Sequence, residues 1–441
     1  MKDTYKWKAL VLLWVAFFLQ QGTRQIFGAT LSSIQGSLGV TATQIGLVGT
    51  VFTFIYGLSV PAAGIAADML NRKWMVVAGV FVFCLGIFAS GFISCLGLMF
   101  VTYGILNGFG QSFYYPSATS IIGQLHKETR ATALSILQMG LYAGIIGCSA
   151  ASGWLAESGA DGWRVPFKVF GGIGIVWAVA MVFLLKDTKP APAADGQAAV
   201  SDKPSLSEVA KVFFGNPSAI LLAVGLGMMV YVDVGFKTWM PSHLEGAFAK
   251  SLEEVAKGMQ AMFGDSVKVP GIKGLAALNA VLWHYLGAFV GVTLGGRISD
   301  RLAKTRPSVR METNIVGLAL AVPFIAWMAY APSLLTCGVA MALFGVFRGV
   351  YDSNLMASLF DIMPQKCHAS AAGIMLSFAF VFGSTSPAIL GVLKEKFPSS
   401  TGLATLAIVY FVGACVIAIA RMRQYGTRGT ARTDGTQPLS Q

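Results

Sequence analysis

The chain has 441 residues, of which 55% are hydrophobic and only 12% are charged, and its formal net charge is +12. Its mean hydropathy is +0.66. This composition excludes an ordinary soluble globule and indicates an integral membrane protein. The positive charge requires no nucleic-acid partner, because basic loops beside anionic lipid headgroups account for it.

Twelve apolar runs follow one another along the chain, each about 20 residues long, the length that a helix needs to cross a hydrocarbon core of about 30 Å. The runs lie roughly at residues 9–33, 44–65, 74–94, 97–123, 131–155, 165–185, 217–240, 275–296, 313–331, 334–362, 369–392 and 402–421. The first run begins after Lys8 and is not followed by a small-residue cleavage site. We expect a retained helix there, not a signal peptide.

Residues 186–208 interrupt this pattern, because they are rich in Pro, Ala and Asp and have no apolar period. Such a composition is typical of a flexible linker. We therefore divide the chain into an N-terminal six-helix bundle (1–185), a cytoplasmic linker (186–214), a C-terminal six-helix bundle (215–424) and a cytoplasmic tail (425–441). The predicted fold class is an all-α membrane protein with twelve transmembrane helices in two pseudo-symmetric bundles.

Two pairs of similar segments indicate that one six-helix unit occurs twice. Gly64 and Asp68 are four residues apart after the second run, and Gly296 and Asp300 repeat this spacing 232 residues later. The segments "RATALSI" and "HASAAGI" open the fifth and eleventh runs at an offset of 238 residues. An internal repeat of this kind is expected when two halves have the same fold.

The distribution of basic residues predicts the orientation. The linker, the two termini and the other segments on the same side hold 21 of the 32 Lys and Arg residues, whereas the opposite segments hold 8. Because basic loops stay in the cytoplasm, we expect both termini to be cytoplasmic, in a plasma membrane of the bacterial inner-membrane type. The loop between the seventh and eighth runs contains "SLEEVAKGMQAMF", which is either a short amphipathic helix or a solvated excursion; its spacing favours the helix.

The sequence contains no motif for catalysis or for a bound cofactor. Six cysteines occur singly, without C-x-x-C pairing, so we expect neither disulfides nor metal ligands. The sequence also lacks a nucleotide-binding loop, a nucleophile elbow and a zinc-protease motif. We predict that the protein is not an enzyme and needs no cofactor or metal.

Five ionisable residues lie inside the predicted crossings: Arg24, Asp233, Lys237, Arg348 and Asp352. Charges within hydrocarbon are costly, so they usually face a wet cavity and mark a pathway. The guanidinium of Arg24 could bind a carboxylate, sulfonate or phosphate through two parallel hydrogen bonds. The alternative is a structural charge that bonds helix carbonyls or pairs with Asp233 or Asp352.

Arg348 and Asp352 are four residues apart and share one helix face. Either they form a salt bridge that neutralises itself, or Arg348 binds substrate while Asp352 takes up and releases a proton. Asp233, the second candidate for proton coupling, has the same spacing to Lys237. Lys237 lies two residues before Trp239, so its ammonium could instead extend to the membrane interface.

Polar neutral residues in the same crossings fit a small hydrophilic ligand. Beside Arg24 and Arg348, the candidates for substrate binding are Gln21, Gln25, Gln111, Tyr115, Gln138, Tyr142, Tyr351 and Asn354. Buried amides also hold helices together, so a structural role is the alternative for each. His284 is expected to be a packing residue.

The Gly-x-x-x-Asp segments resemble a loop of the major facilitator superfamily, and the resemblance covers essentially the whole chain. "GTRQIFGATLSSIQGSLGV" and "GWRVPFKVFGGIGI" resemble the organic-anion symporters, organophosphate antiporters and spinster-like carriers within it. The resemblance implies that helices 1, 4, 7 and 10 line a central cavity. It also implies gating roles for Gly64, Asp68, Arg72, Gly296, Asp300 and Arg301.

Together these features predict a secondary active transporter that works by alternating access. The expected substrate is a small hydrophilic organic anion, such as a sugar acid or related carboxylate, coupled to protons. The expected partners are this substrate, protons and the lipid bilayer, and the expected oligomeric state is a monomer. The alternatives are a spinster-like or multidrug-type carrier of amphipathic compounds and a sugar-phosphate exchanger.

Overall fold

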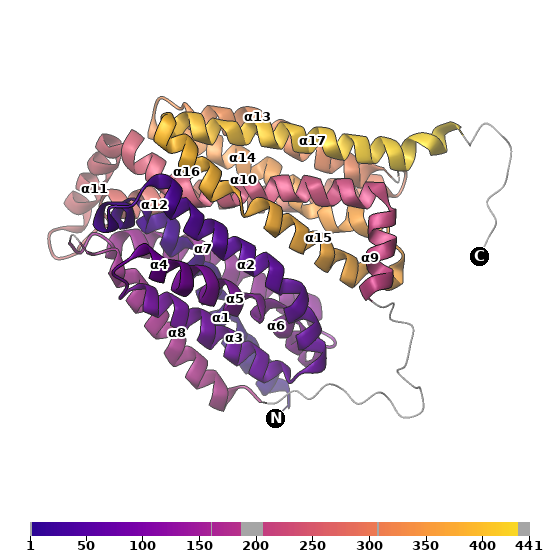
Figure 1. Cartoon of the computed structure of the whole chain (residues 1–441), viewed down its shortest axis with the longest axis horizontal. Helices are drawn as coiled ribbons and strands as arrows, with labels where there is room; N and C mark the ends of the chain where they lie inside the picture. The colour runs from indigo at the N-terminus through magenta and orange to yellow at the C-terminus, as the bar shows by residue number, and fades with distance from the viewer. Residues whose placement is uncertain (1, 160, 187–205, 307, 431–441) are drawn as a thin grey trace.

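The computed structural model describes residues 2–159, 161–186, 206–306 and 308–430 (Figure 1). Within these ranges the chain is helical and contains no strand, which confirms the all-α prediction for the described residues. Ten of the described helices are long and apolar enough to cross a membrane. The protein is therefore an all-helical membrane protein.

The first half of the chain forms one bundle. Its helices are α1 (Lys2–Leu38), α2 (Ala42–Met69), α3 (Arg72–Ser90), α4 (Leu96–Met99), the π-helix η1 (Phe100–Asn107), α5 (Gly108–Ser112), α6 (Tyr114–Leu125), α7 (Arg130–Leu155) and α8 (Arg164–Leu184). The run predicted at 97–123 is thus divided into four consecutive pieces. A π-helical stretch is rare and is frequently found at functional sites.

The second half forms the other bundle. Its helices are α9 (Leu206–Gly215), α10 (Pro217–Ala247), α11 (Ala249–Phe263), α12 (Ile272–Ala303), α13 (Val309–Ala329), α14 (Leu334–Phe360), the 3-10 helix η2 (Gln365–Cys367), α15 (His368–Gly383), α16 (Ser386–Lys396) and α17 (Ser399–Thr430). α11 confirms the short helix predicted in the long loop. α9 lies inside the segment predicted as a linker, of which residues 187–205 lie outside the described part.

Local sequence explains where several of these helices begin. Thr41 and Gln44 form a capping box at the start of α2, and Ser333 and Thr336 form another at the start of α14. In each box the two residues satisfy backbone N–H groups that have no acceptor within the helix. These caps fix the ends of two helices that contribute to the contacts described below.

The two bundles converge at one end and diverge at the other. Figure 1 shows them close together near α11 and apart near α9. Among the described residues, most hydrogen bonds that join the bundles lie at the converging end, for example Ser32 to Glu245, Ser149 to the Ala277 carbonyl and Lys273 to Ser33. Ser377 to the Gly57 carbonyl lies near the middle of α2 and α15. We call the converging end the closed end and the other the open end.

Glycines bring α12 and α14 into backbone contact inside the C-terminal bundle. A Cβ atom on Gly287 or Gly291 would collide with the carbonyl oxygen of Ala342 or Val346 on α14. Conversely, a Cβ on Gly345 would collide with the carbonyl oxygen of His284 on α12. Small residues allow this close approach between membrane helices. The seam sets the register between His284 and the middle of α14.

We expect Gly291→Ala to lower the melting temperature of the detergent-purified protein, because overpacking a close contact costs about 1–3 kcal/mol. The matched control is Gly373→Ala on α15, where an added Cβ meets nothing within 4 Å. That change should leave the melting temperature unchanged or raise it, since alanine favours a helix over glycine by about 1 kcal/mol. Equal melting temperatures for the two variants would contradict the backbone contact.

Candidate substrate site

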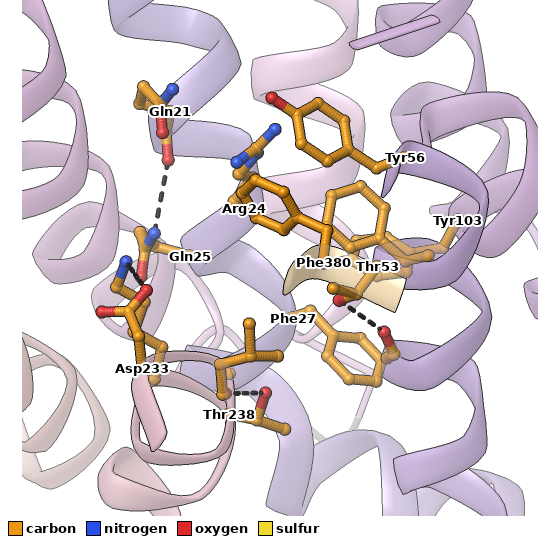
Figure 2. Close-up of a pocket in the computed structure, with 15 residues that line it drawn as sticks. Gln21, Arg24, Gln25, Phe27, Thr53, Tyr56, Tyr103, Asp233, Thr238 and Phe380 are labelled. Atoms are coloured by element: carbon orange, nitrogen blue, oxygen red, sulfur yellow. Dashed lines mark hydrogen bonds and ion pairs between the residues drawn. The ribbon is translucent and has the colours of Figure 1, made fainter. Parts of the chain in front are cut away.

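A cavity lies between the two bundles and has an empty volume of about 650 Å³. Both bundles contribute to its wall. Its lining residues are Gln21, Arg24, Gln25, Phe27, Gly28, Gly49, Phe52, Thr53, Tyr56, Tyr103, Asp233, Val234, Lys237, Thr238 and Phe380. Of the residues predicted to bind substrate or couple protons, Arg24, Gln21, Gln25 and Asp233 line this cavity (Figure 2).

Arg24 is held in the cavity by neutral groups. Its Nε donates to Oε1 of Gln111, and the Gln111 amide donates in turn to Oδ1 of Asn107 at 2.7 Å. Its guanidinium carbon lies 4.3 Å from the centre of the Tyr56 ring, a distance that gives a favourable cation–π contact. Figure 2 shows the two side chains next to each other. These contacts orient the guanidinium without neutralising it.

No carboxylate among the described residues forms an ion pair with Arg24. Its Nη2 is shielded from solvent and has no hydrogen-bond partner in that part of the chain. A buried donor without a partner is costly, more so on a charged group. The N-terminal wall of the cavity therefore carries one positive charge that no described carboxylate neutralises.

The other wall belongs to a network of four charged side chains, of which Asp233 and Lys237 line the cavity, whereas the predicted site residues Arg348 and Asp352 do not. The Asp233 carboxylate on α10 lies 2.7 Å from Nζ of Lys237 and 2.9 Å from Nη1 of Arg348 on α14. Asp352 lies farther from Arg348, with 3.5 Å between Oδ2 and Nε. Two cations thus face two carboxylates. The expected pairing of Arg348 with Asp352 exists, but Asp233 makes the shorter contact.

His284 on α12 completes the surroundings of Arg348. Its Nε2 lies 3.0 Å from Nη1 of Arg348. A guanidinium can only donate, so Nε2 must be the acceptor. The imidazole is fully buried, and its ring lies 4.6 Å from that of Phe344. His284 is thus both the packing residue that the sequence predicts and a hydrogen-bond partner of the buried arginine.

Other predicted binding residues lie outside the cavity lining. Gln111 reaches it through Arg24, and Tyr142 on α7 contacts the ring of Tyr285 across the bundles at 5.9 Å. Tyr115 packs against Phe17 at 5.6 Å. Gln138 is exposed on α7, and Tyr351 and Asn354 are buried within the C-terminal bundle.

The predicted gating residues lie toward the open end. The Nε atom of Arg72 donates to the Ala67 carbonyl at 3.4 Å, and Asp300 lies 3.8 Å from Nη2 of Arg310. Arg301 is exposed, and Cβ atoms on Gly64 and Gly296 would meet nothing closer than 3.8 Å. The side chain of Asp68 lies outside the described residues.

Several residues that line the cavity were not among the substrate-binding residues predicted from the sequence. Thr53 and Tyr56 belong to α2 and Phe380 to α15, helices that the resemblance does not place among the four lining ones. Their signal in the sequence is weak, because aromatic residues are common in membrane helices. Lys237 could be found from its spacing to Asp233, whereas the partnership of His284 with Arg348 joins residues 64 positions apart.

We expect Asp233→Asn to lower the melting temperature strongly, because removing one partner from a buried ion pair costs about 3–5 kcal/mol. Asp161→Asn is the matched control, since the Asp161 carboxylate is 66% exposed beside Arg164 and such pairs contribute about 0–1 kcal/mol. The double variant Asp233→Asn/Lys237→Met restores the balance of charge and should recover part of the loss. A similar melting temperature for Asp233→Asn and Asp161→Asn would show that the network is not buried in the folded protein.

Comparison with known proteins identifies the family of this chain. The profile of the Major Facilitator Superfamily matches residues 13–387. Protein spinster homolog 1 of Xenopus tropicalis is 25% identical over 88% of this chain and 72% of its own length. A probable sulfoacetate transporter of Cupriavidus necator is 24% identical, with 90% and 89% covered, and a D-galactonate transporter of Escherichia coli is 23% identical, with 93% and 94% covered.

Among solved structures, a bacterial homolog of the human lysosomal transporter Spinster, in an inward-facing and unoccupied conformation, superposes with a TM-score of 0.76. The alignment covers 99% of each chain at 17% sequence identity, so it shows that the two chains have the same fold. The sequence-based resemblance is confirmed, and the chain is a membrane transporter and not an enzyme: it belongs to the Major Facilitator Superfamily.

Proposed function

We propose that the protein is a secondary active carrier of a small hydrophilic organic anion, such as a sugar acid or a related carboxylate. The observation that carries this proposal is the uncompensated guanidinium of Arg24 in a cavity between the two bundles. An anion that binds there gains a charge-assisted and geometrically specific contact. Gln21, Gln25 and Thr53 add amide and hydroxyl groups for a polyhydroxylated body.

The charges around the cavity favour a substrate with one negative charge. The network on the C-terminal wall contains two cations and two carboxylates, so it is balanced by itself. Arg24 adds a single positive charge. A monoanion neutralises the site, whereas a dianion leaves one negative charge in a poorly solvated place unless a carboxylate is protonated.

The names of two relatives support an anionic substrate, since one is a probable sulfoacetate transporter and the other a D-galactonate transporter. Both are under 25% identical to this chain. The choice of an organic anion therefore rests on Arg24, and the relatives make it chemically reasonable.

A spinster-like carrier of amphipathic compounds is the second candidate, favoured by the aromatic rings of Phe27, Phe52, Tyr56, Tyr103 and Phe380 in the cavity wall. A carrier of cationic amphipathic compounds would need a free carboxylate to bind the cation. Here Asp233 and Asp352 are both in ion pairs. The paired carboxylates favour the organic anion over a cationic compound.

For the transport cycle we propose twelve crossings: the ten long apolar helices, α1, and the run from α4 to α6. The open end carries the start of α1, the end of α17 and α9 (Figure 1). By the excess of Lys and Arg in its segments, it faces the cytoplasm of a bacterial inner membrane. The structure then represents an inward-open state of two bundles that rock about the cavity.

Proton coupling is assigned to Asp352 and Asp233. Asp352 is the more weakly held of the two, since its contact with Arg348 is 3.5 Å whereas Asp233 bridges two cations. Protonation of Asp352 would leave one net positive charge on the C-terminal wall. That charge would strengthen anion binding in the protonated state.

The central test compares three probes of one carbon skeleton: gluconate, glucarate and glucose. In isothermal titration with detergent-purified protein, we expect gluconate to bind and glucose not to bind. Arg24→Gln should weaken gluconate binding by roughly 10- to 100-fold, the range for a lost hydrogen bond to a charged group. Arg24→Lys should recover only part of the affinity, because an ammonium lacks the planar fork.

The exposed Arg423 on α17 supplies the control variant Arg423→Gln, which should bind gluconate like the unmodified protein. Binding of glucose alone, or equal gluconate affinity in Arg24→Gln, would overturn the anion proposal. Glucarate binding that is as strong as gluconate binding at neutral pH would overturn the preference for a monoanion.

In proteoliposomes, Asp352→Asn should abolish uphill accumulation driven by a proton gradient and retain exchange of labelled for unlabelled substrate. The reason is that asparagine cannot carry a proton through the cycle. Asp361→Asn, which removes a carboxylate near the open end that pairs with Arg310 at 2.7 Å, should keep gradient-driven accumulation. Gradient-driven uptake by Asp352→Asn would remove this residue from the coupling mechanism.

A further inference from the structure

Two short segments on opposite bundles share the pattern Gly-x-Leu-x-Glu, and both lie at the closed end. Gly153 to Glu157 reads "GWLAE", and Gly391 to Glu395 reads "GVLKE". The second follows the first by 238 residues, the same offset that relates the segments at the start of α7 and α15. The two segments are therefore equivalent positions in the two halves of the internal repeat.

Glu157, just after α7, binds the N-terminus of α12 in the opposite bundle. Its Oε2 accepts from the backbone N–H of Gly271 at 2.9 Å. Its Oε1 accepts from the backbone N–H groups of Lys273 at 2.9 Å and Gly274 at 3.2 Å. The first N–H groups of a helix have no acceptor within the helix, and the helix dipole is positive there. A carboxylate is the side chain best suited to that end.

Glu395, near the end of α16, makes the reciprocal contact. Its Oε1 accepts from the Thr43 backbone N–H at 2.7 Å, in the first turn of α2 in the N-terminal bundle. Each bundle thus contributes one carboxylate and one helix N-terminus. The two contacts lie on different seams, α7 with α12 and α16 with α2.

The glycine of each segment lies one helical turn before its glutamate and explains how the carboxylate reaches the other bundle. A Cβ on Gly153 would press against the Lys273 carbonyl oxygen, and a Cβ on Gly391 would collide with the Ala42 carbonyl oxygen. Glycine therefore permits backbone contact between bundles. Residues four apart lie on one face of a helix, so the glutamate then faces the same partner helix.

We propose that Glu157 and Glu395 are paired gating residues that hold the closed end shut, and that both contacts break when the transporter opens on this side. Neither residue lines the cavity, so their role is to set the balance between the two states of the cycle. Glu395 is exposed and Glu157 is half-buried, so water can replace each lost hydrogen bond on opening, which makes the contacts reversible. Loss of either contact should shift the protein toward opening at this end.

The test measures opening at one seam after a change at the other. Ser149→Cys is the reporter, because Ser149 lies in the α7–α12 seam, is 1% exposed and donates to the Ala277 carbonyl at 2.8 Å. It is introduced after the two exposed cysteines, Cys95 and Cys415, are changed to serine. The rate of reaction with a water-soluble maleimide is then measured on the full-length protein in detergent.

We expect Glu395→Gln to raise the labelling rate about two- to fivefold, because an exposed charged contact contributes up to about 1 kcal/mol. Glu157→Gln should do the same, and the double variant should exceed either. The effect of Glu395→Gln is decisive, because a purely local structural role on the α16–α2 seam would not expose a cysteine on the α7–α12 seam. If Glu395→Gln does not fold, Gly391→Ala tests the same seam, because its Cβ would press on the Ala42 carbonyl oxygen. It should also raise the labelling rate.

Glu254→Gln is the matched control, since Glu254 is an exposed glutamate on α11 at the same end. It should leave the labelling rate unchanged. An unchanged rate in folded Glu395→Gln or Gly391→Ala, or an equal rise in Glu254→Gln, would overturn the proposal. Because the reporter needs no substrate, the outcome is independent of whether gluconate binds.

Discussion

A buried arginine with its counter-charges determines how the C-terminal bundle is built. A charge in the middle of an apolar helix is costly unless it is paired and hydrogen-bonded. Arg348 obtains its partners from three helices: Asp233 from α10, His284 from α12 and Asp352 from its own helix α14. The glycine seam between α12 and α14 brings the short imidazole of His284 within hydrogen-bonding distance of the guanidinium.

In the N-terminal bundle, Arg24 has no carboxylate partner among the described residues. This difference between the bundles gives the cavity its positive charge. Arg24 is oriented by an amide and an aromatic ring, which are neutral groups. Its hydrogen-bond partner Gln111 follows the π-helix Phe100–Asn107, which also supplies Tyr103 to the cavity wall. The two bundles therefore present different surfaces to the cavity, one balanced and one positive.

The sequence alone predicted much of the helix content and the set of charges, for physical reasons that can be stated. Apolar length is a local property, so most long helices were found near their true bounds. The five charges in apolar runs were expected to face a cavity. Arg24, Asp233 and Lys237 line it, whereas Arg348 and Asp352 join the last two in one network without lining it.

What sequence reasoning did not find depends on how helices are rotated against one another. Tyr351 is next to Asp352 in the chain, but it packs against α13, where a Cβ on Gly317 would lie 3.1 Å from the Cβ of Tyr351. Its side chain therefore faces the interior of the bundle. The partnership of His284 with Arg348 depends on the glycine seam, and spacing along one helix cannot reveal it. The glutamates of the repeated Gly-x-Leu-x-Glu segments lie just outside the apolar runs, so a charge within a membrane crossing, the signal that identified Arg24 and Arg348, does not distinguish them.

The cavity and the closed end are connected by single helical turns. On α1, Arg24 is four residues before Gly28, and on α10, Asp233 is four residues before Lys237. A Cβ on Gly28 would press against the Lys237 carbonyl oxygen, so these two helices cross directly beside the charged groups. Such a contact involves backbone and few side chains, and it can separate without a change of rotamers. In the function proposed above, a substrate that neutralises Arg24 acts one helical turn from this crossing, so substrate binding and the separation of the two helices can be coupled over a short distance.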